Sequence, residues 1–511
     1  MGDRIVSAEH GGGASGGWRG PDVEGQHKVP WDGLRVCVVG ARVVGLSAAR
    51  AMRRLGAEIT LVDRYDDEET SRRVEQLPAE GIAVRLGDDR TLPEGCDLLV
   101  VAPGIPPEAP IVLAARAARV PVWGDGELAW RLRRPRADGS FTPWLAVTGT
   151  NGKTTAVRML AAMLEAAGKT TVACGNVGYT VIDAVTDETD HDVLAVELSS
   201  QQLHWTDSMS ALAAAVLNIA PDHIDWHGSM DAYAAAKGKI YEHCRVACVY
   251  NAADPATEAL VEQADVVEGC RAIGFTLGAP GLSMLGVVDG ILADRAFVQD
   301  RRNTAAELGT IFDVEPHAPH NIANALAAAA LARAYGVEPS AVRDGLRAFR
   351  PDPHRIEFVA AIDGIDYVDD SKATNTHAAA ASLAAYQDVV WIAGGLAKGA
   401  EFDELVAGAA GRLRGAVLLG RDRGRIAQAL ARHAPSLPVA DVGGADDGLT
   451  GTEAMARAVA EAGRLAAGHL PAGGTVLLAP ACASMDLFAN YGERGDVFAR
   501  LVRERKGAAR P

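Results

Sequence analysis

Short apolar segments alternate with segments of helical spacing along most of this chain. Runs of apolar residues, typical of strands buried on both faces, stand at 34–40, 58–62, 97–101, 145–147, 171–173, 193–197, 212–217, 389–393 and 475–478. Several are followed by a turn and then by apolar residues three or four positions apart, as in 41–56 and after Gly152. Strands that alternate with helices in this way predict an α/β fold with mostly parallel sheets.

Two proline-bearing segments divide the pattern into three domains. They are RLRRPRADGS with the following Thr142-Pro143, and RPDPHR at 350–355. We predict a Rossmann-like N-terminal domain at 31–140, a central P-loop-type ATPase domain with a mostly parallel sheet at 141–350, and a Rossmann-like C-terminal domain at 351–505. A length of 511 residues suits three domains of ordinary size. Residues 1–30 are expected to form a disordered glycine-rich tail, and residues 506–511 a frayed one.

The segment LAVTGTNGKTT at 145–155 indicates a phosphate site, because an apolar strand enters a glycine-containing turn that opens a helix. Glycines let backbone N–H groups face a phosphate, and the helix N-terminus adds positive charge. Lys153 can reach the outer phosphates, and the hydroxyl of Thr154 can bind Mg²⁺. The spacing is shorter than G-x-x-x-x-G-K-[ST], so an ordinary turn with a surface lysine is the alternative. The residues expected at the nucleotide are Gly149, Thr150, Asn151, Gly152, Lys153, Thr154 and Thr155.

Two further strands of the central domain end at residues that could bind a metal ion or act in catalysis. Glu197 ends the apolar run 193–197, where a Mg²⁺ ligand or a water-activating group would sit; an exposed glutamate is the alternative. Asp222, His223 and Asp225 follow the run 212–217, and Lys237 lies on the next helix one turn after a tyrosine. A lysine on an alanine-rich helix more often extends its side chain into solvent. A carbamate on its amine, however, would supply anionic oxygen ligands to a second Mg²⁺.

The N-terminal domain begins like half of a dinucleotide-binding fold. A strand, a glycine turn, a helix and Asp63 at the tip of the next strand follow in order. Arg42 replaces the second glycine of G-x-G-x-x-G, although Gly45 is in place, so we favour a Rossmann-like unit that binds its nucleotide differently. A sheet domain without a ligand remains the alternative.

The remaining candidate residues lie on one helix and at three strand ends of the last domain. Asn321 and Asn324 are one turn apart on a helix and could hold adenine or ribose, unless Asn321 only caps the helix. In the last domain, polar loops follow three strands, at 369–375, 394–399 and 479–484. Because carboxyl ends of parallel strands share one sheet edge, that edge is the expected binding face.

Composition narrows the class of protein. A net charge of −16 argues against an electrostatic grip on nucleic acid. Seven cysteines without a C-x-x-C pair indicate a reduced, cytoplasmic protein without a zinc knuckle. No apolar run approaches the length of a membrane span, and the N-terminus lacks the apolar core of a signal peptide. We therefore expect a cytoplasmic monomer that does not insert into membranes.

Ten motifs together resemble the Mur ligases over about residues 34–505. They are TGTNGKTT, GNVG, ELSSQQL, APDHIDWH, AAAKGKIY, PHNIANALAA, HRIE, DDSKATNTHAA, GGLAKGAEF and APACASMDLFANYGERG. DSKATN and ACAS-D-F are similar to the D-glutamate-adding members, whereas the phosphate loop is shared with other Mur ligases and folylpolyglutamate synthase. The resemblance implies ATP-dependent amide bond formation in peptidoglycan precursor synthesis, in which the carboxylate of UDP-N-acetylmuramoyl-L-alanine becomes an acyl phosphate that D-glutamate attacks through a tetrahedral intermediate.

The resemblance also implies a role for each matching residue. For the nucleotide, Lys153 would bind the β/γ-phosphates, and Asn324, Arg355 and Asp370 would contact ATP. For two Mg²⁺ ions, the ligands would be Thr154, Glu197, His223 and Lys237 as a carbamate. The UDP-linked substrate would meet Val43, Val44, Asp63, Arg64, Gly104, Asn176, Ser199 and Gln202. D-glutamate would be surrounded by Lys372, Thr374, Lys398, Ser484 and Tyr491.

Some positions depart from the family pattern. Arg42 and Val44 stand where relatives carry a glycine and a hydroxyl residue, Leu396 where some carry an acid, and Tyr491 where phenylalanine is common. Two alternatives stay open. A Mur-type or folylpolyglutamate-type ligase with another amino acid would have a different loop in place of DSKATN, and a non-catalytic nucleotide-binding regulator would have lost Lys153, Glu197, His223 or Lys237.

Overall fold

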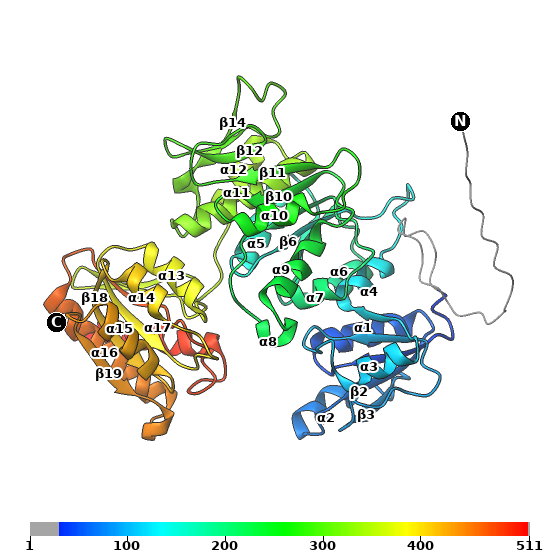
Figure 1. The fold of residues 1–511 in the computed structure, drawn as a ribbon, viewed down its shortest axis with the longest axis horizontal. Helices are drawn as coiled ribbons and strands as arrows, with labels where there is room; N and C mark the ends of the chain where they lie inside the picture. The colour runs from blue at the N-terminus through cyan, green and yellow to red at the C-terminus, as the bar shows by residue number, and fades with distance from the viewer. Residues whose placement is uncertain (1–29, 509–511) are drawn as a thin grey trace, which may run out of the picture. The chain divides into compact units, whose positions relative to one another are not determined.

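The computed structural model describes residues 30–508 as three sheets with their covering helices (Figure 1). The chain divides into two compact units between Arg131 and Leu132. The expected glycine-rich tail lies outside the described residues except for Pro30. The expected C-terminal fraying starts too early, because helix α17, Tyr491–Ala508, continues past Lys506. No helix among the described residues has the length and apolarity needed to cross a bilayer.

The N-terminal unit is a five-stranded parallel sheet in the order β3-β2-β1-β4-β5. The order reverses beside β1, as in doubly wound nucleotide-binding folds. Its core strand β1 has four consecutive buried residues after the exposed Arg35, which explains why these four are all apolar. The elements are β1 (Arg35–Val39), α1 (Val43–Arg54), β2 (Glu58–Asp63), α2 (Glu68–Val74), β3 (Ala83–Leu86), β4 (Leu98–Val101), α3 (Pro110–Ala117), β5 (Val122–Gly124) and α4 (Asp125–Leu132).

The central part of the second unit is built on a nine-stranded sheet in the order β14-β13-β12-β11-β10-β9-β6-β8-β7. Its strands are parallel from β7 to β12, and β13 and β14 are antiparallel. The strands are β6 (Trp144–Thr148), β7 (Thr171–Gly175), β8 (Val193–Glu197), β9 (Ala213–Val216), β10 (Ala247–Asn251), β11 (Arg271–Phe275), β12 (Met284–Val288), β13 (Ile291–Asp294) and β14 (Ala306–Thr310).

Helices cover this sheet (Figure 1), and α5 begins directly after the phosphate loop. The α-helices are α5 (Lys153–Ala166), α6 (Val181–Thr186), α7 (Ser200–His204), α8 (Ile224–His227), α9 (Met230–Gly238), α10 (Pro255–Glu262), α11 (Pro319–Tyr335) and α12 (Pro339–Ala348). The short 3₁₀ helices are η1 (Lys239–Tyr241) and η2 (Ile311–Asp313). The apolar faces of α5, α11 and α12 form one core with the sheet, which fixes the position of Lys153 at the start of α5.

The C-terminal part has a six-stranded sheet in the order β15-β16-β20-β17-β18-β19, in which only β15 is antiparallel to its neighbour. The strands are β15 (Glu357–Ile362), β16 (Ile365–Asp369), β17 (Val389–Gly394), β18 (Leu413–Leu419), β19 (Val439–Gly443) and β20 (Thr475–Leu478). The helices are α13 (Thr376–Ala384), α14 (Asp403–Ala409), α15 (Arg423–His433), η3 (Ala445–Asp447), α16 (Gly451–His469) and α17.

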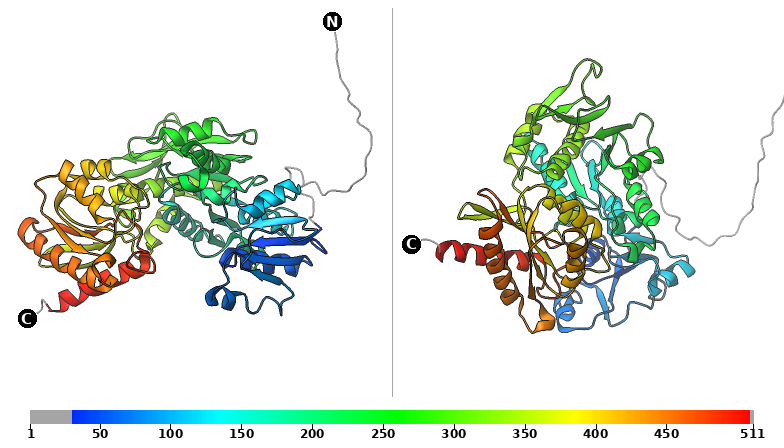
Figure 2. Two further views of the ribbon diagram at one scale, coloured as in Figure 1. Left: turned by 60° about the horizontal axis from the view of Figure 1, so that its bottom comes forward. Right: turned by 60° about the vertical axis from the view of Figure 1, so that its left-hand side comes forward.

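Both faces of this sheet are covered, as Figure 2 shows. Trp391 of β17 packs into the core that includes α13, α14 and α15, and its neighbour Ile392 packs into the core that includes α16 and α17. Alternate residues of one strand therefore serve two cores, so the strand must be apolar at every position. The predicted α/β class with three Rossmann-like or P-loop-type sheets is confirmed.

Helix α12 approaches α5 so closely that a side chain at Gly345 has no space. A Cβ atom there would lie 2.4 Å from the Cα atom of Met163. We expect Gly345→Ala to push α12 from α5 and to destabilise the protein by about 1–3 kcal/mol. The midpoint of thermal unfolding should then fall by roughly 2–4 °C per kcal/mol.

The matched control for Gly345→Ala is Gly468→Ala in α16, where nothing lies within 4 Å of the added Cβ atom. Alanine has the higher helix propensity, so this substitution should leave the midpoint unchanged or raise it. Equal midpoints for the two variants would contradict the close packing of α12 on α5.

Candidate active site

The phosphate loop is closed around Lys153. Gly152 precedes α5 with φ +84°, a left-handed conformation that favours glycine, and a Cβ atom there would lie 2.3 Å from Oδ1 of Asn324. The Nζ atom of Lys153 donates to the carbonyl oxygens of Gly149 at 3.0 Å and Thr150 at 2.9 Å. Burial lowers the pKa of Lys153, while the charges of nearby Glu197 and Asp222 oppose this. The strand, turn and helix predicted for this segment are present, and Asn324 lies beside the turn.

The loop after β9 holds the phosphate loop from the side. The hydroxyl of Thr150 lies 2.9 Å from that of Tyr233 and 2.9 Å from the backbone nitrogen of Ala220, which donates to it. Asn151 donates its backbone N–H to Oδ1 of Asn218 at 2.9 Å, and Nδ2 of Asn218 donates back to the Asn151 carbonyl at 3.1 Å. Tyr233 and Asn218 were not among the predicted site residues. Their only signal in the sequence was their place beside Lys237 and Asp222.

Glu197 carries a carboxylate oxygen suited to a cation. It stands at the buried end of β8, where Nδ2 of Asn176 donates to its Oε1 at 3.0 Å. Its second oxygen, Oε2, is buried and has no hydrogen-bond partner. A buried carboxylate oxygen left unpaired is costly, and a hard cation such as Mg²⁺ prefers such an oxygen. The exposed-glutamate alternative is therefore wrong, and the site fits a metal ion.

Lys237 is buried rather than solvated. It is 2% exposed on α9, and its Nζ atom donates to the Gly149 carbonyl at 2.8 Å. Burial, and then the charge of Lys153, hold the pKa of Lys237 well below its usual value. This direction favours the uncharged amine, which is the form that reacts with electrophiles. The alternative, a lysine side chain extended into solvent, is wrong.

His223 and Asp222 differ in their relation to the site. Asp222 lines the cavity described below and acts electrostatically on Lys153 and Lys237. His223 has φ +50° at the start of α8, and its side chain is half exposed, with Nε2 3.6 Å from Oδ2 of Asp222. Sequence reasoning gave Asp222 no role, although it directly precedes His223.

A cavity of about 740 Å³ joins the phosphate loop to the first loop of the C-terminal sheet. This volume suits a nucleotide-sized ligand. The cavity also receives Asn251, Phe275 and His377, which the sequence did not indicate. The predicted site residues that line it are Thr150, Asn151, Gly152, Lys153, Thr154, Thr155, Asn176, Glu197, Asn324, Arg355, Asp370, Lys372 and Thr374.

Helix α11 supplies the amides expected at the nucleotide, and the loop after β16 supplies the acid. Asn321 and Asn324 lie on one face of α11, and Nδ2 of Asn324 is 3.5 Å from Oδ1 of Asn321. Asn321 does not cap the helix, because α11 starts at Pro319. Asp370 accepts a hydrogen bond from Ser382 of α13, and burial raises the pKa of this carboxyl group to about 6.

The three polar loops of the C-terminal sheet meet at one edge, as predicted. Leu396, after β17, donates its backbone N–H to the carbonyl of Ala483, after β20, at 2.9 Å. Lys372, after β16, places its Nζ atom 3.9 Å from the centre of the Tyr491 ring, a cation–π contact. Ser484 is buried in this group, and Lys398 is exposed with φ +49°.

Arg494 holds two of these loops together. It is 1% exposed on α17 and donates to the Ser371 hydroxyl at 2.9 Å, the Ser371 carbonyl at 2.8 Å and the Cys482 carbonyl at 3.1 Å. Ser371 in turn donates its hydroxyl to the Tyr491 carbonyl at 2.7 Å. A buried guanidinium thus positions the residues that flank Lys372 and Ser484. Only the arginine in the ERG segment could have indicated it.

The N-terminal candidate residues surround the turn after β1. Asp63 accepts from the backbone nitrogens of Ala41 at 2.6 Å and Tyr65 at 2.9 Å, so its carboxylate fixes this turn. A Cβ atom at Gly45 would lie 1.8 Å from the Gly40 carbonyl, which explains the glycine there. Val43 is exposed at the start of α1. Val44, Arg64 and Gly104 lie beside the same strand ends. Their role in binding stays a prediction.

Ser199 and Gln202 form reciprocal hydrogen bonds. The Ser199 hydroxyl accepts from the backbone nitrogen of Gln202 at 3.2 Å, and Oε1 of Gln202 accepts from that of Ser199 at 2.8 Å. This capping box starts α7 beside Glu197. The substrate role of both residues stays a prediction.

Comparison with known proteins gives matches along most of the chain. Residues 147–332 match the family model "Mur ligase middle domain", and residues 354–482 match "Mur ligase, glutamate ligase domain". The chain is 65% identical over 473 residues to the UDP-N-acetylmuramoylalanine–D-glutamate ligase of Streptomyces avermitilis, covering 93% of this chain and 98% of that protein. The enzyme of the same name from Thermobifida fusca is 56% identical over 480 residues, which cover 93% of this chain and 99% of that protein.

Solved structures resemble the chain in fold. MurF from Acinetobacter baumannii has a TM-score of 0.57 at 18% identity, covering 92% of this chain and 93% of that one. The UDP-N-acetylmuramate-alanine ligase of Thermotoga maritima has a TM-score of 0.53, also at 18% identity, and covers 93% of this chain and 100% of that one.

The His354–Asp369 pair predicts a pH-dependent stability of the C-terminal sheet. Nδ1 of His354 lies 2.7 Å from Oδ2 of Asp369, and this hydrogen bond raises the pKa of His354 above 6.5. Because the folded-state pKa is the higher one, the stabilisation is complete below the unfolded value and is lost as pH rises through the folded value. The thermal unfolding midpoint should therefore fall from pH 6 towards pH 9.

The control for this pH dependence is His354→Asn, which keeps a donor towards Asp369 but does not titrate. Asparagine also tolerates the φ of +63° at this position. Its midpoint should change less over the same pH range. Parallel pH profiles for the two proteins would show that His354 is not the titrating group.

Proposed function

This chain belongs to the Mur ligase family, and we propose that it is the ATP-dependent ligase that adds D-glutamate to UDP-N-acetylmuramoyl-L-alanine, releasing ADP and phosphate. The family resemblance of the sequence motifs is confirmed. The observation that carries the proposal is the cavity that brings Lys153 and Glu197 of the phosphate site together with Lys372 of the C-terminal sheet. The relatives at 65% and 56% identity are named for this activity, and the match covers nearly their full length.

The reaction requires activation of a carboxylate, which is a poor electrophile. Transfer of the γ-phosphoryl group to the carboxylate of the UDP-linked substrate gives an acyl phosphate with a good leaving group. The D-glutamate amine then attacks, and the tetrahedral intermediate collapses with loss of phosphate. Charge that gathers on the phosphoryl oxygens must be met by fixed donors and cations. Lys153 and the backbone N–H groups at the start of α5 supply such donors.

We assign the two substrates ATP and D-glutamate to two different groups of residues. Lys153 and Arg355 face the polyphosphate, and Asp370 faces the ribose. Lys372, with Thr374, Lys398, Ser484 and Tyr491, receives D-glutamate, whose two carboxylates suit lysines. Arg494 does not touch the substrate in this proposal; it positions the loops that do.

Thr154 and Glu197 would hold one Mg²⁺ ion, and the unpaired Oε2 atom of Glu197 supports this assignment. A second ion would be held by His223 and by Lys237 as a carbamate. The carbamate forms when the neutral Lys237 amine bonds to the carbon of CO₂ and releases a proton. The low pKa of Lys237 favours the reacting form. When bound, Mg²⁺ supplies positive charge to the phosphoryl oxygens.

The UDP-linked substrate is assigned to the N-terminal unit through Val43, Val44, Asp63, Arg64 and Gly104, and to the central sheet through Asn176, Ser199 and Gln202. The hydrogen bonds of Asp63 to the β1–α1 turn support a preformed loop there. Arg42 would add a positive charge to this loop, which suits a diphosphate.

The activity is tested by phosphate release with ATP, Mg²⁺ and UDP-N-acetylmuramoyl-L-alanine. We expect release with D-glutamate and background rates with L-glutamate, L-lysine or diaminopimelate, because only one stereoisomer presents both carboxylates to the C-terminal loops. Release that does not depend on D-glutamate would falsify the assignment. Release with diaminopimelate instead would indicate another Mur-type ligase.

The carbamate is tested with Lys237→Ala. This variant should lose on the order of 100-fold in kcat, the size of effect seen when a group that orients a metal is removed. Added acetate or formate should restore part of the activity by supplying the missing carboxylate. The matched control is Lys239→Ala, two residues after Lys237. It removes a partly exposed lysine that is paired with Asp207, and this variant should stay active. If short-chain carboxylates leave Lys237→Ala unchanged, the carbamate role is wrong.

A further inference from the structure

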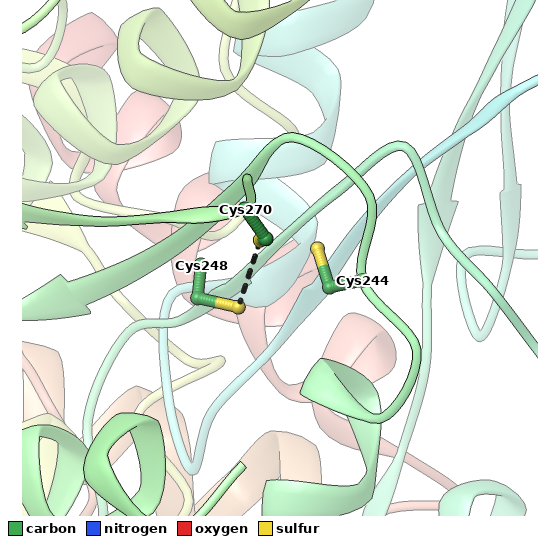
Figure 3. A group of neighbouring side chains, drawn as sticks. All are labelled: Cys244, Cys248 and Cys270. Carbon is green, nitrogen blue, oxygen red and sulfur yellow. Dashed lines mark hydrogen bonds between the residues drawn. The ribbon is translucent and has the colours of Figure 1, made fainter. Parts of the chain in front are cut away.

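Three cysteines form a cluster that the ligase reaction does not use. Cys244 follows η1, Cys248 lies in β10, and Cys270 directly precedes β11. Figure 3 shows their side chains directed toward one another. The three Sγ atoms all lie within 4.8 Å of one another, and those of Cys248 and Cys270 are 3.8 Å apart. All seven cysteines of the chain are free thiols.

The separation of the sulfur atoms suits ligands around one ion. Two thiolates bound tetrahedrally to one ion at the usual Zn–S distance of about 2.3 Å would lie about 3.8 Å apart. A disulfide would require about 2.05 Å between the same atoms. Cys248 and Cys270 therefore already have the spacing of metal ligands, whereas a disulfide would require their sulfur atoms to approach each other further.

The surroundings of the cluster also suit a soft metal. Cys244 and Cys248 are 0% and 2% exposed, and Cys270 is partly exposed, so one side is open to an arriving ion. Hydrogen bonds with Cys244 and then Cys248 lower the pKa of Cys270. Sulfur ligands select soft cations over Mg²⁺.

The cluster is separate from the ligase cavity. It lies at the start of β10 and β11, whereas Asn251 and Phe275, at the ends of the same two strands, line the cavity. A metal bound to the three sulfurs would therefore link β10 to the segment before β11 without entering the cavity.

We propose that Cys244, Cys248 and Cys270 form a three-thiolate site for one soft d¹⁰ cation of the Zn²⁺, Cd²⁺ or Cu⁺ class. Binding forms three metal–sulfur bonds and releases the remaining thiol protons to solvent, without a change of oxidation state. Water takes any fourth position on the side of Cys270. The bound ion stabilises the central domain by cross-linking segments that are 22 residues apart along the chain.

The test uses the full chain, reduced and freed of metal with a chelator, and titrated with Cd²⁺ in excess Mg²⁺. The Mg²⁺ keeps the oxygen ligands of the ligase site occupied. We expect one equivalent of Cd²⁺ to produce the ultraviolet charge-transfer absorbance of cadmium thiolates and to raise the thermal unfolding midpoint. Cys270→Ser should weaken Cd²⁺ binding by at least about 10-fold and abolish the rise in the midpoint. Because Cys270 is partly exposed, this variant should fold.

The control is Cys96→Ser, which removes one thiol outside the cluster and should bind Cd²⁺ like the wild type. Absence of the absorbance in the wild type, or equal absorbance in Cys270→Ser, overturns the proposal. Loss of two thiols after peroxide treatment, in a protein that binds no Cd²⁺, also overturns it and identifies a redox pair instead. If the buried Cys244→Ser variant does not fold, Cys270→Ser still decides the question.

Discussion

The carbonyl oxygen of Gly149 accepts hydrogen bonds from the buried Lys237 and the partly buried Lys153, and the active site depends on this arrangement. Lys153 donates from 3.0 Å and Lys237 from 2.8 Å. Two ammonium groups on one acceptor repel each other, and burial removes the water that would screen them. Burial lowers the pKa of both amines, and the charge of Lys153 lowers that of Lys237 further. Glu197 and Asp222 oppose this lowering at both lysines, but the largest charge effect on Lys153 is that of Glu197, whereas the largest on Lys237 is that of Lys153.

Contacts from outside the phosphate loop explain why the loop can be short. A loop with fewer residues has fewer backbone groups with which to fix its own shape. Here the missing constraints come from outside the loop, from Asn218 and Tyr233 on one side and from Asn324 beneath Gly152. At the other wall of the cavity, Arg494 has the corresponding task for the loops around Lys372 and Ser484. Both sets of loops are therefore shaped before a ligand binds, which would reduce the entropy lost on binding.

The sequence predicted those parts of the structure that local patterns determine. The runs 193–197 and 475–478 coincide with β8 and β20, because strands buried on both faces must be continuously apolar. The glycine, lysine and threonine of the phosphate loop were recognised because their chemistry is carried by adjacent residues. The predicted meeting of three C-terminal loops also followed from the parallel order of the strands.

The sequence could not predict interactions between distant segments. Arg494 contacts Ser371 across 123 positions, and Thr150 meets Tyr233 across 83. An arginine on an amphipathic helix, or a tyrosine before an alanine run, has the same local pattern whether or not it makes such contacts. The burial of Lys237 was equally hidden, since only packing against β6 distinguishes it from a surface lysine. The cysteine cluster was missed because its members have no regular spacing.

The partly exposed thiol of Cys270 has a practical consequence for inhibitor discovery. It directly precedes β11, whose last residue, Phe275, lines the nucleotide cavity. An electrophilic compound that alkylates this thiol would disturb β11 from its far end and reduce turnover without occupying the cavity. Hits from screens of reactive compounds should therefore be compared between the wild type and Cys270→Ser before they are developed as nucleotide competitors.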